Sequence, residues 1–167
     1  LYNINTVGLR FFTVYGPWGR PDMALFLFTK AILNGEPINI FNEGNMKRDF
    51  TYIDDIVESV ERLIKKIPEK NTSFNRDYPD ASSSLAPHKI FNIGNSSPIN
   101  LMNYISELED SIGCKAIKNY LPMQPGDVKA TAADTSALEE WIDFKPGTST
   151  KTGIENFVKW YRGYYDV

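Results

Sequence analysis

Two residue types that often build enzyme sites are almost missing from this sequence. Among its 167 residues, Cys114 is the one cysteine and His88 the one histidine. An internal disulfide is therefore excluded, and no Cys/His cluster with the spacing of a metal site is present. A catalytic pair of histidines within this chain is excluded as well.

Long apolar runs and a strong net charge are also lacking. No apolar run approaches the roughly 18 residues that cross a bilayer, and no secretory signal is seen. The formal charge is −3 and the pI is about 5.2, which gives no general attraction to nucleic acid or to acidic membranes. We therefore expect a cytoplasmic protein with no nucleic acid or membrane partner. Its size allows one good hydrophobic core.

The most informative stretch is an apolar segment followed by glycine and proline. Residues 7–14 are rich in β-forming residues, which predicts a buried strand, and residues 16–21 read GPWGRP before a helical pattern begins. In open α/β sheets, ligands lie beyond the carboxyl ends of the strands. The loop after residue 14 is therefore the natural place for a site.

Further strands and helices follow at intervals typical of an α/β fold. Strands are predicted over residues 37–41, 47–52, 89–93 and 116–120. Helices are predicted over residues 23–33, from 54 to about 66, 100–112, up to 141, and 150–164. We expect Asn34-Gly35 to end the first helix, and Asp22, Asp54-Asp55 and Asp134 to cap three helix starts.

The amphipathic patterns predict which helix faces are buried. We expect Ile56, Val60, Leu63 and Ile64 to face inward in the second helix, and Ile154, Phe157, Val158 and Tyr161 in the last. Residues 68–87 are polar and rich in Ser, Asn, Asp and Pro, so we interpret them as a mobile surface insertion. Tyr78 or Phe74 could instead anchor this segment to the body.

Four motifs resemble one protein family. They are residues 10–24 (RFFTVYGPWGRPDMA), 46–55 (MKRDFTYIDD), 91–96 (FNIGNS) and 124–127 (QPGD). In this order they resemble the NAD-dependent epimerase/dehydratase family, which belongs to the extended short-chain dehydrogenases/reductases. Within it the resemblance is greatest to the UDP-glucuronate 4-epimerases.

The resemblance implies roles for residues of the first motif. Phe12 would contact the nicotinamide cofactor, whereas Thr13 and Arg20 would lie in the part of the site that handles the sugar carboxylate. A threonine hydroxyl is a short, stiff donor and acceptor, and a guanidinium suits a carboxylate. From periodicity alone, Phe12 would be a core residue and Thr13 an ordinary strand residue. An isolated loop arginine such as Arg20 is more often solvated.

The later motifs imply contacts with the nucleotide. Arg48 would grip the diphosphate of UDP, and Phe41 would stack under the uracil. Gln124 and Asp127 would hydrogen-bond the ribose; galactose epimerases carry Arg where this chain has Gln124, which favours the glucuronate branch. The alternative for Arg48 is a structural ion pair with Glu43 or Asp49, and that for Phe41 is a core position.

Several neighbours of these residues have other expected roles. Asp49 would support the fold, because adjacent strand residues point to opposite faces. Thr131 is small where some relatives have Tyr, which suggests a roomier sugar pocket. Asn95 and Ser96 would form a turn rather than touch ligand.

Two motifs that the family's reaction requires are missing from this sequence. The reaction uses a GxxGxxG loop for the NAD pyrophosphate and a Tyr-x-x-x-Lys pair, whose Tyr removes the C4 hydroxyl proton while hydride moves to NAD. The chain contains neither string. The expected fold is therefore α/β, with residues 1–167 forming the C-terminal part of such an enzyme: the last Rossmann strands and helices plus a small substrate-binding α/β subdomain.

The expected function follows from this division. The full-length parent would be a homodimeric, NAD-dependent enzyme that interconverts UDP-glucuronate and UDP-galacturonate at C4 through a 4-keto sugar. The start at Leu1, just before an internal strand, fits a missing N-terminal NAD-binding part, so NAD would be bound mainly outside this chain and the chain alone would be inactive. The alternatives are a nucleotide-sugar dehydratase or decarboxylase of the same family, and a non-catalytic nucleotide-sugar-binding module.

Overall fold

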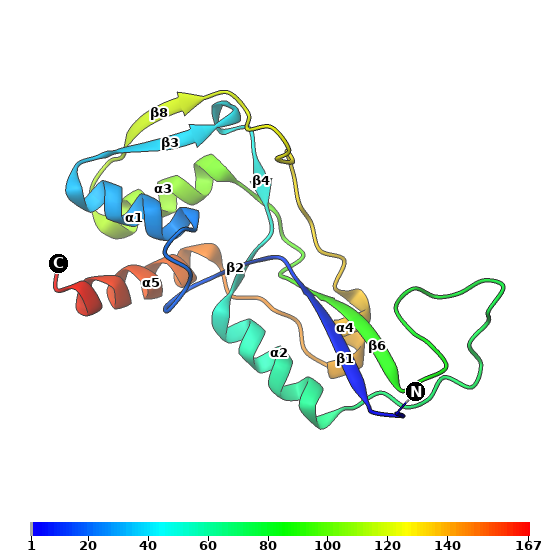
Figure 1. Ribbon diagram of the computed structural model, residues 1–167. Helices are drawn as coiled ribbons and strands as arrows, with labels where there is room; N and C mark the ends of the chain where they lie inside the picture. The colour runs from blue at the N-terminus through cyan, green and yellow to red at the C-terminus, as the bar shows by residue number, and fades with distance from the viewer. Residues whose placement is uncertain (1) are drawn as a thin grey trace.

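The computed structural model describes residues 2–167 as two groups of helices and strands (Figure 1). The elements in chain order are β1 (Thr6–Phe11), β2 (Thr13–Tyr15), α1 (Ala24–Asn34), β3 (Pro37–Phe41), the 3₁₀ turn η1 (Asn42–Gly44), β4 (Lys47–Arg48), β5 (Phe50–Tyr52), α2 (Ile53–Lys65), β6 (His88–Ile93), β7 (Ile99–Asn100), α3 (Leu101–Ile112), β8 (Ile117–Leu121), α4 (Ser136–Ile142) and α5 (Thr150–Tyr165). No helix in the described part of the chain is both long and apolar enough to span a membrane.

The strands pair over long distances in the sequence. Three pairs are parallel, namely β1 with β6, β2 with β5 and β3 with β8, and β4 pairs with β7 in the antiparallel sense. Parallel neighbours need crossover connections, and helices of this chain lie in those connections. The expected α/β class is confirmed.

The larger core lies among α1, α3, α5 and strands β2, β3 and β5. Tyr104, Phe157 and Ile40 are completely buried there. Phe50 stacks on Tyr104 with ring centroids 4.0 Å apart, so β5 is fixed on α3. All four inward positions predicted for α5 are buried, which confirms that prediction.

The smaller core joins β1 and β6 to α2 and α4 (Figure 1). Phe91 and Ile93 of β6 pack with Ile56 and Leu63 of α2. The prediction for Ile64 is wrong, because its side chain is 72% exposed. Fewer positions of α2 are buried than its apolar pattern predicts.

The predicted strand over residues 7–14 is two strands, because its hydrogen-bond partner changes at Phe12. The amide of Phe12 donates to the carbonyl of Ile93 (3.3 Å), and that of Thr13 donates to the carbonyl of Asp49 (3.3 Å). The predicted strand over residues 47–52 is broken in the same way, between β4 and β5, at Asp49. Both breaks lie where the two groups of elements meet.

Three predicted helix caps are wrong. Helices α1, α2 and α4 begin after Met23, Tyr52 and Thr135, and none of these caps makes a side-chain capping bond. Asp55 instead accepts hydrogen bonds from the amides of Gly147 (3.2 Å) and Thr148 (2.9 Å), which ties α2 to the start of α5. The C-cap at Gly35 is confirmed, with φ of 68°.

The segment from 66 to 87 has no helix or strand of its own. An isolated bridge joins Ser83 to Lys89, and Asn71, Asn75 and Asp80 accept hydrogen bonds from nearby backbone amides. Tyr78 is 84% exposed, so it does not anchor the segment. Its mobility stays a prediction.

Candidate functional site

A cavity of about 670 Å³ lies beside α1 and β3. This volume is within the range of small-molecule sites. Thr13, Phe41, Arg48, Gln124 and Asp127 all line it. These are five of the seven residues that sequence reasoning assigned to ligand contacts, and they come from segments far apart in the chain.

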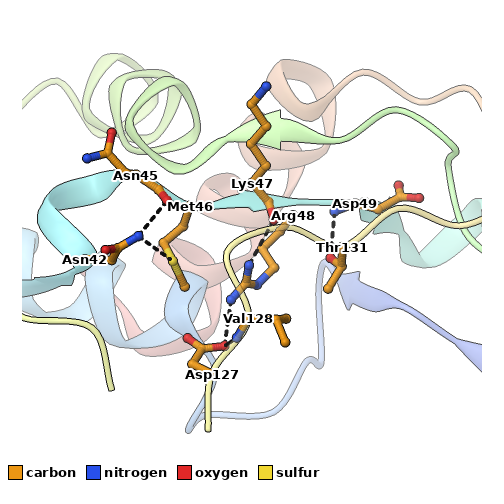
Figure 2. Close-up of polar contacts among 9 residues, drawn as sticks. All are labelled: Asn42, Asn45, Met46, Lys47, Arg48, Asp49, Asp127, Val128 and Thr131. Carbon is orange, nitrogen blue, oxygen red and sulfur yellow. Dashed lines mark hydrogen bonds and ion pairs between the residues drawn. The ribbon is translucent and has the colours of Figure 1, made fainter. Parts of the chain in front are cut away.

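Arg48 and Asp127 form an ion pair in the wall of this cavity. The Nη2 atom of Arg48 lies 2.8 Å from Oδ1 of Asp127, and Figure 2 shows the two side chains directed toward one another. The side chains are 19% and 33% exposed, so the pair is partly shielded from water. The alternative partners of Arg48, Glu43 and Asp49, do not pair with it.

Both members of the pair keep hydrogen-bonding capacity. Arg48 also donates from Nη1 to the carbonyl of Lys47 (2.9 Å), which uses two of the five guanidinium donors. Oδ1 of Asp127 also accepts from the amide of Val128 (2.7 Å). Within residues 2–167, Oδ2 of Asp127 accepts no hydrogen bond. The pair therefore presents donors and one acceptor oxygen side by side.

Asp49 lies at the break between β4 and β5, directly after Arg48, and its contacts fix the chain at this point. It is completely buried, and its carboxylate accepts from the amides of Asn95 (3.2 Å), Ser96 (3.0 Å) and Ala133 (2.9 Å). Figure 2 shows Asp49 directed away from Arg48, as the alternation of strand residues requires. The structural role of Asp49 is confirmed. The chain bends at Ser96, where φ is 53°, and the expectation that Asn95 and Ser96 form a turn rather than touch ligand stays a prediction.

Thr131 belongs to this junction rather than to the cavity wall. Its hydroxyl accepts a hydrogen bond from the amide of Asp49 at 3.4 Å (Figure 2). The suggestion that its small size widens the sugar pocket therefore stays a prediction.

The floor of the cavity is apolar, and sequence reasoning missed it. The cavity is lined by Met23, just before α1, and by Ala24, Leu27 and Ala31 of α1 itself. The side chain of Leu27 is 51% exposed. The helical pattern predicted over residues 23–33 does not by itself separate these positions from core positions. The signal was present, because α1 reads ALFLFTKAILN and is apolar on more than one face. One face packs in the core, and another is left for the cavity.

Arg20 and Phe12 do not line the cavity. Arg20 is bound to Asp22 instead, with Nε to Oδ1 at 3.1 Å and Nη2 to Oδ2 at 2.5 Å. The hydrogen bond from Arg20 lowers the pKa of Asp22, which does line the cavity. Arg20 is thus next to the site, whereas Phe12 is half-buried at the point where β1 gives way to β2.

The tyrosines with shifted pKa values are poor candidates for a catalytic base. Burial raises the pKa of Tyr15 and Tyr104, with smaller contributions from Glu107, and burial also raises the pKa of Tyr52 and Tyr161. A tyrosine base needs the opposite shift. The cavity itself offers apolar side chains, the ring of Phe41 and the Arg48–Asp127 pair, which suits a ligand that has an apolar or aromatic part and both hydrogen-bond acceptors and donors.

Comparison with known proteins gives the family. A sequence model described as the NAD dependent epimerase/dehydratase family matches residues 1–94, more than half of the chain. The chain belongs to this family. Among the described residues there is no group of acidic, His and Cys side chains placed to hold a metal ion.

Related members of the epimerase/dehydratase family are about twice as long as this chain. An uncharacterized 37.6 kDa protein of Escherichia coli O111:H- is 58% identical over all of the chain, which covers 50% of that protein. A probable UDP-glucuronate 4-epimerase of Rhizobium meliloti is 49% identical over 99% of the chain and 49% of its own length.

A solved structure supports the same relationship. A UDP-glucuronic acid 4-epimerase variant from Bacillus cereus, in complex with UDP-4-deoxy-4-fluoro-glucuronic acid and NAD, superposes with a TM-score of 0.80 at 34% identity. The match covers 98% of this chain and 47% of that one. The fold is therefore an α/β fold that matches about half of an epimerase of the short-chain dehydrogenase/reductase type.

Proposed function

We propose that this chain is the C-terminal, substrate-binding part of an NAD-dependent epimerase that interconverts UDP-glucuronate and UDP-galacturonate at C4. The observation that carries the proposal is the shared cavity. Residues assigned from separate motifs, Thr13, Phe41, Arg48, Gln124 and Asp127, line one space of about 670 Å³. Related proteins named as UDP-glucuronate 4-epimerases support the choice of substrate.

The ion pair at the wall of the cavity explains how a nucleoside diphosphate would be held. Three donors of Arg48 remain for phosphate oxygens, and Oδ2 of Asp127 can accept from the ribose hydroxyls. Phe41 offers a ring for the base, and Gln124 a second polar contact for the ribose. The sugar would then extend toward Thr13, with Arg20 reaching its carboxylate.

The residues of this chain do not by themselves form a dinucleotide site. The spacing of Gly16 and Gly19 is compatible with a phosphate loop, but other atoms of this chain already occupy the space beside their Cα atoms. A Cβ at Gly16 would lie 2.6 Å from Cγ2 of Ile53, and one at Gly19 would lie 3.0 Å from the carbonyl oxygen of Gly16. We propose that NAD, which supplies hydride transfer when bound, contacts Phe12 here and is otherwise held by the remainder of the parent protein.

The first experiment measures UDP and UMP binding to the 167-residue chain by calorimetry. The chain should prefer UDP, because Arg48 contacts the second phosphate. Arg48→Ala removes hydrogen bonds to a charged group, each worth about 1.5–3 kcal/mol, so UDP affinity should fall roughly 10- to 100-fold while UMP affinity changes less.

The matched control is Arg76→Ala, which removes an exposed arginine from the irregular segment away from the cavity. It should leave both affinities unchanged. Failure of the chain to bind UDP, or an unchanged preference in Arg48→Ala, would contradict the proposal.

A further inference from the structure

The loop that carries Arg20 is attached to the last helix by an exposed tryptophan. Trp18 is 73% exposed, yet its ring centroid lies 5.2 Å from that of Trp160 and 5.0 Å from that of Tyr164. Trp160 and Tyr164 are themselves stacked at 5.4 Å, one turn apart on α5. The three rings form a small aromatic cluster on the surface, here called the Trp18 clasp.

The backbone of this loop is constrained to place Trp18 on the helix. Trp18 has a φ of 61°, a left-handed conformation that is costly for a bulky side chain. The amide of Gly19 donates to the carbonyl of Gly16 (3.2 Å), so the strained residue lies inside a closed turn. A conformation of this kind persists where surrounding contacts hold it, and such sites are often functional.

The clasp and the cavity lie at opposite ends of the same short loop. Arg20 follows Trp18 by two residues, and the amide of Met23 donates to the carbonyl of Arg20 (3.1 Å) just before α1 begins. Asp22, the partner of Arg20, lines the cavity. Between Trp18 and Met23, the position of Arg20 is therefore fixed from both sides.

We infer that the Trp18 clasp is a positioning device for Arg20, and that it sets the preference for a sugar that carries a carboxylate. The inference rests on the proposed function, because it assumes that a UDP-sugar occupies the cavity. Trp160 and Tyr164 do not line that cavity, so they act through the loop. Loosening the clasp lets Arg20 move away from the carboxylate while the nucleotide contacts of Arg48 stay in place.

The test compares the affinities of the 167-residue chain for UDP, UDP-glucose and UDP-glucuronate by calorimetry. Wild-type protein should prefer UDP-glucuronate over UDP-glucose, and Arg20→Ala should abolish that preference. Trp18→Ala and Tyr164→Ala should each reduce it roughly five- to tenfold, because a charged contact depends on placement. The affinity for UDP should stay within about twofold of wild type in all of these variants, since they leave Arg48 in place.

Two further variants separate positioning from general stability. Tyr164→Phe keeps the ring that touches Trp18 and should retain the full preference. Tyr165→Ala removes a neighbouring exposed aromatic that contacts Tyr161 and Tyr164 but not Trp18, and it should also leave the preference intact.

The outcomes distinguish this inference from the proposed function. If wild-type protein binds no UDP, the proposed function fails and the inference fails with it. If UDP binds but UDP-glucuronate is not preferred, or if Tyr164→Ala keeps the preference that Arg20→Ala loses, the clasp has no positioning role and only this inference is overturned.

Discussion

Asp49 shows how one buried carboxylate can organise a binding site that it does not touch. Its carboxylate accepts three backbone hydrogen bonds from residues 95, 96 and 133, and its own carbonyl accepts from Thr13. It therefore fixes the end of β6, the start of β2 and the chain before α4 at one point. Because Arg48 is the preceding residue, the same contacts fix where Arg48 leaves the backbone.

Replacing Asp49 with asparagine should destabilise the protein strongly. The amide has the same shape, but its nitrogen would face backbone donors, and at least one buried amide would be left without an acceptor. An unsatisfied buried group costs about 1–3 kcal/mol, and the lost charge weakens the remaining bonds, so we expect a loss of about 3 kcal/mol in the free energy of unfolding. Urea denaturation followed by circular dichroism would measure it.

Asp134→Asn is the matched control for that substitution. Asp134 accepts hydrogen bonds from the amide and hydroxyl of Ser136, but it is exposed. Asp134→Asn should lower the free energy of unfolding by about 1 kcal/mol or less, because water can hydrogen-bond the Ser136 groups in place of the carboxylate. Equal effects of the two substitutions would refute the special role of Asp49.

At the scale of elements, Glu109 joins α3 to β8. Its side chain is 4% exposed, and its carboxylate accepts hydrogen bonds from Lys118 and from the amide of Ala116 (3.0 Å). Lys115 adds an ion pair at 3.1 Å. Burial pushes the pKa of Glu109 upward, but the contacts with Lys118, Ala116 and Lys115 outweigh burial and hold the pKa below 4.5.

This depressed pKa predicts the direction of a pH effect. A carboxyl group with a lower pKa in the folded state contributes stability above its unfolded pKa of about 4.5, and this contribution is lost as the pH falls toward the folded value. Glu109→Gln should therefore flatten the fall in urea midpoint between about pH 5 and about pH 3. Glu69→Gln, at an exposed position, should leave it unchanged. If the urea midpoint of Glu109→Gln fell with decreasing pH as steeply as that of wild type, this prediction would be wrong.

The elements also show what the sequence can and cannot predict. The apolar spacing of residues 150–164 predicts α5 and its buried face, because a helix face is a local property. The breaks at Phe12 and Asp49 are not local, because they occur where a strand exchanges one distant partner for another. Similarly, Asp55 was predicted to cap α2, but it contacts a segment more than 90 residues away.

For the candidate site, motif order was more informative than apolar periodicity. Motif order identified five residues that the fold brings to one cavity, although their roles as ligand contacts stay predictions. Periodicity alone would have placed Phe41 and Thr13 in the core or on an ordinary strand. Leu27 was missed for the converse reason, since an apolar residue on a cavity floor has the same pattern as one in the core.

At the scale of the whole molecule, the cavity lies on the side of the larger core. Its walls come from α1, β3, β4 and the chain after β8, which Figure 1 shows together at one end of the structure. The smaller core, with β1 and β6, lies at the other end and carries Phe12 near its boundary. Under the proposed function, binding of the nucleotide sugar and contact with the cofactor would therefore fall on different parts of the chain.

This division predicts that the chain binds substrate without converting it. The sequence has no Tyr-x-x-x-Lys pair, and the tyrosines whose pKa is shifted are shifted upward, away from a role as base. Incubation of the 167-residue chain with UDP-glucuronate and NAD should therefore yield no UDP-galacturonate by liquid chromatography, under conditions in which calorimetry shows UDP bound. The UDP-glucuronic acid 4-epimerase of Bacillus cereus serves as the positive control for the assay. Formation of UDP-galacturonate by the chain alone, lost in Arg48→Ala, would show that a base within these residues carries the reaction.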